Sequence, residues 1–141
     1  MIWKQTFDLP YLNQFFKNTL GEVLGMEFSE MGSDYLVIKM PVDKRTVQPY
    51  GLLHGGASVA LAETLGSVAS TMCIKDLDKE MAVGVEINAN HLRPVTKGFV
   101  YGRVTPIRVG RKMHVWNIEI KDDKERLVCV SRLTIAVVER S

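Results

Sequence analysis

Residues 55–73 read GGASVALAETLGSVASTMC, and this stretch decides the fold. It has the length of a helix, is apolar on nearly all sides, and contains one charged residue, Glu63. A helix that is apolar all round is buried on most of its surface. We therefore predict a central helix from about Gly55 to Cys73, covered by a sheet on one side and by a further surface on the other.

Four runs with the composition of strands follow a charged turn at Lys75 to Glu80. Their predicted limits are Met81 to Leu92, Phe99 to Val109, Lys112 to Lys121 and Leu127 to Val138. The turns between them fall at Pro94 to Gly98, Gly110-Arg111 and Asp122 to Glu125. Side chains alternate along a strand, so parity places His91 on the face shared by Met81, Val83, Val85, Ile87 and Ala89.

The chain before the central helix predicts a helix and a hairpin. Asp8 caps a short helix with Pro10 in its first turn, and apolar residues recur at helical spacing as far as Leu20. The segment from Met26 to Val42 alternates and turns at Gly32-Ser33, which indicates two strands. One apolar helix followed by long strands predicts an α+β fold, an antiparallel sheet wrapped around the helix, in one domain spanning residues 1–141.

The composition limits the classes of function. The chain has 141 residues, of which 46% are hydrophobic and 24% charged, typical of a globular protein. A net charge of +2 argues against nucleic acid as a partner. The cysteines Cys73 and Cys129 form no metal or disulfide pattern. With no signal peptide and no apolar run of the ~20 residues that cross a bilayer, we expect a cytoplasmic protein that does not bind membranes.

Glu63 is the first candidate for chemistry. An unpaired buried carboxylate is costly, so its presence on this helix needs a reason. Ser67 and Ser70 follow at four and seven residues and extend a polar stripe that suits a cleft. The alternative is structural: a glutamate hydrogen-bonded to a neighbour, or facing water at the edge of the helix.

The second candidate is the segment Gln48 to Gly56, which leads into the same helix. The first turn of a helix offers free N–H groups, and glycines let a ligand oxygen approach the backbone. Gly55 could therefore polarise a carbonyl, with His54 beside it, although a histidine at this place can equally be a packed side chain. Glu63 lies eight residues after Gly55, roughly 12 Å along the axis at ~1.5 Å per residue. Antiparallel packing of two such helices in a homodimer would bring the two groups together.

Two further positions could bind a ligand. His91 ends an apolar strand and could form the lip of a pocket, or it could simply touch solvent. Arg108, Gly110, Arg111 and Lys112 form a basic turn that could meet phosphates, although most such turns are only solvated. Tyr50, Val68 and Met72 are apolar residues that could set the volume of an acyl pocket.

Three motifs occur in order: QPYGLLHGGAS at residues 48–58, AETLGS at residues 62–67 and INANHLRP at residues 87–94. Together they resemble the hotdog-fold acyl-CoA thioesterases of the phenylacetate and 4-hydroxybenzoyl-CoA type. The resemblance covers nearly the whole chain. It is greatest to the bacterial branch that acts on 1,4-dihydroxy-2-naphthoyl-CoA in menaquinone synthesis and proofreads enterobactin synthesis. It implies dimers that join their sheets and usually pair into tetramers, with active sites at the dimer interface.

The resemblance also implies roles for single residues. Glu63 matches the catalytic carboxylate, acting as nucleophile or general base, and Gly55 matches the backbone N–H that polarises the thioester carbonyl. Gln48 and His54 match residues that orient the thioester or water, and Ser67 matches a helper one turn beyond the carboxylate. The remaining matches bind substrate: His91 near the acyl group, and Gly84, Leu92, Arg93, Arg108, Gly110 and Arg111 along coenzyme A.

The sequence therefore predicts an enzyme that hydrolyses acyl-CoA thioesters, with an aromatic acyl group, to a free acid and coenzyme A. No metal or cofactor is expected. The loop from Ile74 to Glu80 is slightly longer than in the most similar members of that branch. A thioesterase that acts on acyl or aryl carrier proteins instead of coenzyme A esters is therefore an alternative. Two alternatives are a catalytically silent module that binds acyl-CoA and a hotdog dehydratase. The dehydratase fits less well, because such enzymes pair a catalytic histidine with a carboxylate at a different spacing. Here His54 precedes the helix that carries Glu63.

Overall fold

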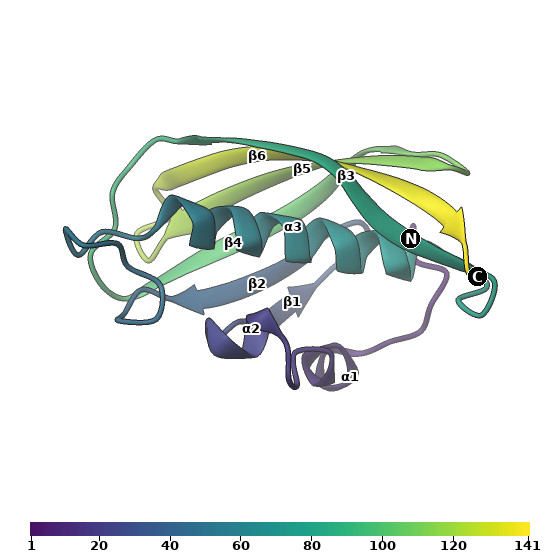
Figure 1. Cartoon of the computed structure of the whole chain (residues 1–141), viewed down its shortest axis with the longest axis horizontal. Helices are drawn as coiled ribbons and strands as arrows, with labels where there is room; N and C mark the ends of the chain where they lie inside the picture. The colour runs from purple at the N-terminus through teal and green to yellow at the C-terminus, as the bar shows by residue number, and fades with distance from the viewer.

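The structure, a computed structural model, describes residues 1–141 and consists of one six-stranded sheet and a long helix packed against it (Figure 1). The helices are α1 (Leu9–Gln14), α2 (Leu20–Val23) and α3 (Gly55–Met72). The strands are β1 (Glu27–Met31), β2 (Leu36–Pro41), β3 (Glu80–His91), β4 (Phe99–Val109), β5 (Met113–Asp122) and β6 (Leu127–Glu139). They lie in the order β1-β2-β4-β5-β6-β3, and every neighbouring pair is antiparallel. The predicted antiparallel sheet around one central helix is confirmed.

Helix α3 lies close to the sheet because glycines of each element leave room for leucine side chains of the other. A Cβ atom at Gly66 would come within 2.3 Å of the Leu133 side chain, and one at Gly102 on β4 within 2.6 Å of the Leu65 side chain. Leu61 and Leu65 of α3 are fully buried. A leucine buried in this way contributes about 1.5–3 kcal/mol, so packing against the sheet holds the helix in place.

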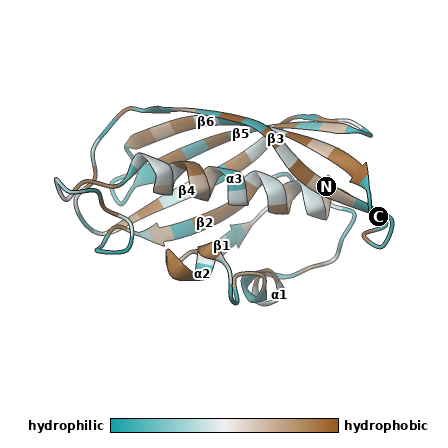
Figure 2. Ribbon diagram, in the orientation of Figure 1, coloured by the Kyte–Doolittle hydropathy of each residue, from teal (hydrophilic) through white to brown (hydrophobic).

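Strand β5 alternates as predicted, with one face toward α3. Figure 2 shows hydrophobic and polar residues mixed along each strand. On β5, Trp116, Ile118 and Ile120 are fully buried, whereas the residues between them are only partly covered. The predicted limits of the four C-terminal strands agree with the structure to within one residue at each end.

The predicted face of β3 is wrong in its first half. β3 pairs with β6 through a register shift, so that Gly84 faces Ile135 while Glu86 faces Thr134. Val85 is the extra residue of this bulge and is exposed. The side chains packed on the core are therefore Ala82 before the bulge and Ile87 and Ala89 after it. Met81, Val83 and Val85 do not share the face of His91, because one inserted residue reverses the alternation.

The N-terminal helix is shorter than predicted. The Asp8 cap is confirmed, since its carboxylate accepts the Tyr11 N–H at 2.9 Å. The helix ends at Gln14, however, and helical structure resumes only at Leu20. Asn18 lies between them in the left-handed region, at φ 61°, and a right-handed helix cannot pass through that conformation. The predicted hairpin is confirmed as β1 and β2, closed by the Gly32 N–H bonded to the Tyr35 carbonyl at 2.9 Å.

Candidate active site

The loop before α3 is a short hairpin that presents the start of the helix. Its arms meet in the Val47–Leu53 bridge, and Gly51 adopts φ 80° at the tip, a conformation that favours glycine. The Gln48 N–H donates to the Leu52 carbonyl at 2.8 Å, and the Gln48 side chain accepts the Tyr50 N–H. Tyr50 itself is 88% exposed at the loop tip and does not line the pocket that contains Glu63.

The first turn of α3 leaves one backbone donor free. His54 caps the helix, with its Nδ1 atom accepting the Gly56 N–H at 2.7 Å. The N–H groups of Ala57 and Ser58 donate to the His54 carbonyl. The Gly55 N–H has no hydrogen-bond partner in the chain. It is therefore available to an oxygen atom at the positive end of the helix dipole.

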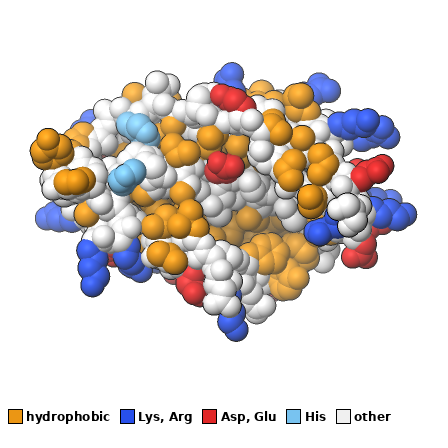
Figure 3. Space-filling view, viewed as in Figure 1, with side chains coloured by type: hydrophobic (Ala, Val, Ile, Leu, Met, Phe, Trp, Pro, Cys, Tyr) orange, Lys and Arg blue, Asp and Glu red, His pale blue; other side chains and the backbone are white.

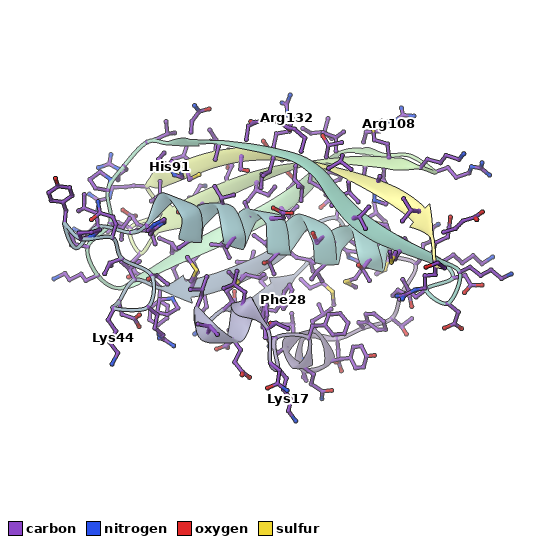
Figure 4. The ribbon with its side chains drawn as sticks, viewed as in Figure 1. Lys17, Phe28, Lys44, His91, Arg108 and Arg132 are labelled. Carbon is purple, nitrogen blue, oxygen red and sulfur yellow. The ribbon has the colours of Figure 1, made fainter.

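His91 at the end of β3 covers this helix start. A Cβ atom at Gly55 would lie 2.9 Å from the His91 Nε2 atom, so a side chain at position 55 would displace the ring. Figure 4 labels His91 beside the beginning of α3, and Figure 3 shows histidine side chains exposed at this end of the molecule. A pocket of ≈340 Å³ opens here. It brings together five of the predicted site residues, namely Gln48, Gly55, His91, Leu92 and Arg93.

Glu63 projects from the middle of α3 toward β3. Its Oε2 atom lies 2.7 Å from the position that a Cβ atom would take at Gly84, so the absence of a side chain there makes room for the carboxylate. Glu63 is half-buried and forms no hydrogen bond or ion pair with the rest of the chain. The structural alternative of a glutamate bonded to a neighbour is therefore wrong, and both carboxylate oxygens can accept a ligand or water.

A second pocket, of ≈290 Å³, contains Glu63 together with the predicted residues Ser67 and Val68. Its other wall is the α1–α2 segment, through Phe15, Phe16, Thr19, Leu20 and Gly21. This wall was not among the site residues predicted from the sequence. The only signal for it was the helical spacing of these residues, which also fits a purely structural role.

The polar stripe predicted on α3 does not extend to Ser70. That residue is fully buried, with its Oγ atom 2.8 Å from the Nδ1 atom of His114 and 2.7 Å from the Nε1 atom of Trp116. The side of α3 that lies beside β3 at Glu63 is covered by β5 at Ser70, because the strands cross the helix obliquely (Figure 1). Met72 is also fully buried in the core and, contrary to the prediction, does not line the pocket that contains Glu63.

The basic turn joins β4 to β5, at the other end of α3 from His91. Figure 4 places Arg108 at that end, and both Arg108 and Arg111 are exposed. Gly110 and Arg111 line a third pocket, of ≈290 Å³, with Lys4 and Lys75 as further positive charges on its wall. The two lysines and His114, which also lines it, were not predicted, since they are distant from the turn in sequence.

One chain therefore divides the predicted residues among three pockets. Gln48, Gly55 and His91 share the first, Glu63 and Ser67 the second, and Gly110 the third. His54 lies beside the first pocket without lining it, and Gly84 leaves room for the Glu63 carboxylate. This separation agrees with the ~12 Å between Gly55 and Glu63 expected from the helical rise.

The site offers carboxylate and backbone chemistry without a metal cluster. No group of three or more histidine, cysteine, aspartate or glutamate side chains is arranged to hold a metal ion. Burial raises the pKa of Cys73 to about 11, so this thiol is protonated at neutral pH and is a poor nucleophile. None of the helices combines the length and hydrophobicity required to span a bilayer.

Known proteins resemble this chain over nearly its whole length. Residues 50–129 match the thioesterase superfamily. The 1,4-dihydroxy-2-naphthoyl-CoA hydrolase of Escherichia coli is 49% identical over 98% of this chain and 100% of its own length. The proofreading thioesterase EntH of Cronobacter turicensis is 49% identical over 98% of this chain and 99% of its own. The crystal structure of a thioesterase from Haemophilus influenzae superposes with a TM-score of 0.95, at 51% identity, covering 99% of this chain and 96% of that one.

Proposed function

The chain belongs to the thioesterase superfamily and is a thioester hydrolase, and we propose that it cleaves aromatic acyl-CoA esters to a free acid and coenzyme A. The substrate we propose first is 1,4-dihydroxy-2-naphthoyl-CoA or a similar aroyl-CoA. The observation that carries the proposal is the unpartnered Glu63 carboxylate in a pocket with an apolar wall. A carboxylate left without a partner in such a place is available for reaction.

Glu63 has two routes to the same products. As general base it takes a proton from water, the resulting hydroxide adds to the thioester carbon, and the coenzyme A thiolate leaves with that proton. As nucleophile its own oxygen adds to the carbon and expels the thiolate, and water then hydrolyses the mixed anhydride. In both routes negative charge develops on the carbonyl oxygen, where the free Gly55 N–H would stabilise it.

The complete site needs two copies of the chain. In our proposal Glu63 and Ser67 of one protomer face Gln48, His54 and Gly55 of its partner. The edge strand β3 supports this arrangement, because eleven of its twelve residues pair with β6 on one side and its other side is open. Exposed apolar side chains on and beside β3 also favour burial against a second copy, among them Val85 (59% exposed) and Leu92 (56%).

The acyl group would occupy the pocket beside Glu63. Phe15, Leu20 and Val68 line it, and an aromatic ring packs well against such side chains. The name of the E. coli relative supports a bicyclic aromatic acid. His91, Leu92 and Arg93 would flank the thioester and the pantetheine arm, and Gly84 would keep the carboxylate free of contact with a side chain.

The nucleotide of coenzyme A would lie at the basic turn. Arg108 and Arg111 are exposed there, and Lys4 and Lys75 add positive charge beside Gly110. Phosphate groups are recognised by such combinations of basic side chains and backbone N–H groups. Removing one arginine should therefore raise KM with little change in kcat.

Thiol release from a panel of thioesters tests the proposal. The panel contains a hydroxynaphthoyl-CoA, benzoyl-CoA, phenylacetyl-CoA, medium-chain acyl-CoA esters and the same aroyl group on an aryl carrier protein. We expect the aroyl-CoA esters to react fastest. We also expect Glu63→Gln to lower kcat by about 10²–10⁴-fold, because the amide is neither base nor nucleophile.

The exposed Glu139 provides a matched control, and Glu139→Gln should keep wild-type rates. Faster cleavage from the carrier protein would assign the enzyme to carrier thioesters instead. Tight binding of CoA esters without cleavage, or wild-type activity in Glu63→Gln, would contradict the proposed function.

A further inference from the structure

Three polar side chains form a connected chain in the core between α3 and β5. Trp116 Nε1 donates to Ser70 Oγ at 2.7 Å, and Ser70 Oγ lies 2.8 Å from His114 Nδ1. Trp116 and Ser70 are fully buried and His114 is 2% exposed. The rings of His114 and Trp116 stand edge to face, 6.1 Å apart. The network joins the C-terminal half of α3 to the beginning of β5.

The chemistry of the three groups indicates which of them donates and which accepts in each hydrogen bond. An indole N–H can only donate, so the Ser70 oxygen accepts from Trp116 and its hydroxyl proton is free to point at His114. Burial lowers the pKa of His114, and a hydrogen bond to the Gly110 backbone partly offsets this shift. The ring is therefore neutral at pH 7. If Nδ1 accepts the Ser70 hydroxyl proton, the single proton of the neutral ring is on Nε2.

The network meets the basic turn at His114, which pairs with Val109 across that turn. The Gly110 N–H donates to the Met113 carbonyl at 2.9 Å and closes the turn through Arg111 and Lys112. Arg108 packs along Gly110, since a Cβ atom there would lie 3.2 Å from the Arg108 Nε atom. His114 and Arg111 line the same ≈290 Å³ pocket. The network thus ends at the pocket that Arg111 also lines.

We propose that His114, held by Ser70, is a positioning residue that fixes the β4–β5 turn so that Arg108 and Arg111 can bind the phosphates of a coenzyme A nucleotide. The proposal rests on the proposed function for its ligand. Packing alone does not call for three polar groups in this core, because apolar side chains of similar volume fill such a space without requiring hydrogen bonds.

The kinetic test compares two substrates that differ only in the nucleotide, benzoyl-CoA and benzoyl-pantetheine. The variants are Ser70→Ala and His114→Phe, which break the network at two points. We expect the KM for benzoyl-CoA to rise about fivefold or more, with kcat within about twofold, while both constants for benzoyl-pantetheine stay unchanged. His114→Gln keeps an acceptor and a donor on one side chain and should restore KM.

Ile38→Val is the matched control, because Ile38 is fully buried on β2 and belongs to neither the turn nor the network. It should leave the constants for both substrates unchanged. An unchanged KM for benzoyl-CoA in Ser70→Ala and His114→Phe would overturn the proposal. So would an equal loss of activity on both substrates, which would indicate a general structural role.

Hydrogen exchange tests the same proposal in the free protein, independently of any reaction. We expect the Gly110 amide to exchange faster in Ser70→Ala and His114→Phe than in the wild type. The Gly32 amide, which closes the β1–β2 turn, serves as the internal reference and should not change. Unchanged exchange at Gly110 would overturn the positioning role, whereas a wild type inactive on both esters would contradict only the proposed function.

Discussion

At the scale of single residues, two glycines shape the site. At each of them, a neighbouring side chain lies where a Cβ atom would otherwise be. Gly55 leaves room for the His91 ring, and Gly84 leaves room for the Glu63 carboxylate. Neither has a positive φ, so steric space rather than backbone conformation explains glycine at both positions.

Gly84→Ala should therefore damage activity more than stability. The added Cβ atom would lie 2.7 Å from Glu63 Oε2, at the far end of a flexible side chain that can move away. We expect a fall in kcat of about 10–100-fold, since a displacement of the order of 1 Å in a reacting group can cost about 10²-fold. The melting temperature should stay close to that of the wild type. Unaltered kcat would mean that the position of the carboxylate does not matter.

His114 predicts a pH dependence of stability. Because burial lowers its pKa from 6.5, the unfolded chain binds a proton more readily than the folded one. Its contribution to the free energy of unfolding is complete above pH 6.5 and is lost as the pH falls from there toward the folded-state pKa. Asp43 and Asp122, whose pKa values are also lowered, lose their contributions only below 3.8.

Urea unfolding at pH 7 and pH 5, at one protein concentration, measures this effect. The wild type should lose stability between the two values, and His114→Phe should lose less. Equal losses in both proteins would show that His114 does not titrate in this range.

Single residues could be predicted without the family resemblance only where local spacing carried the information. Glu63 was recognisable as the one charge on an apolar helix, and Gly55 by its place at the helix start. The contact of Glu63 with Gly84 and the Ser70–His114 hydrogen bond join residues 21 and 44 positions apart. Such contacts depend on how the sheet crosses the helix, which no local pattern records.

At the scale of elements, the turn between β5 and β6 depends on one carboxylate. Asp122 is 6% exposed and accepts hydrogen bonds from the backbone N–H groups of Lys124 and Arg126 and from the Arg126 side chain, at 2.8–2.9 Å. Burial alone would raise the pKa of Asp122, but these hydrogen bonds hold it below 3.8. The turn lies outside all three pockets that contain the predicted site residues.

Asp122→Ala should therefore lower stability and leave catalysis intact. The substitution leaves backbone donors without a partner, which costs about 1–3 kcal/mol when the groups are buried. Urea unfolding should show this loss, with kcat and KM on benzoyl-CoA unchanged. A variant as stable as the wild type would mean that water replaces the carboxylate at no cost.

Elements were predicted well where the alternation was regular and poorly where one residue interrupted it. Phe99 to Val109 forms β4 at the predicted limits. The face of β3 was wrong before Val85, because a bulge inserts a residue that the sequence does not mark. The N-terminal helix was too long because the left-handed Asn18 gives only a weak signal.

At the scale of the whole molecule, the free edge of β3 and the separated pockets have one common explanation. A single chain leaves Glu63 and the Gly55 N–H too far apart to act on one carbonyl, and it leaves a twelve-residue strand unpaired on one side. A two-fold dimer would resolve both. The sequence suggested this from the rise of one helix, but the arrangement of the partner could not be derived from a single chain.

The most direct test of a shared site is to mix two inactive variants, Glu63→Gln and Gln48→Ala, that fail in different halves of it. Each variant is first shown to be inactive and folded, and equal amounts are then unfolded together and refolded. In a shared site, each mixed dimer regains one site with both wild-type residues, and half of the dimers are mixed. We therefore predict that thiol release from benzoyl-CoA returns to about a quarter of the wild-type rate. No recovery from a mixture shown to contain mixed dimers would contradict the account, because it would mean that each chain forms its site alone.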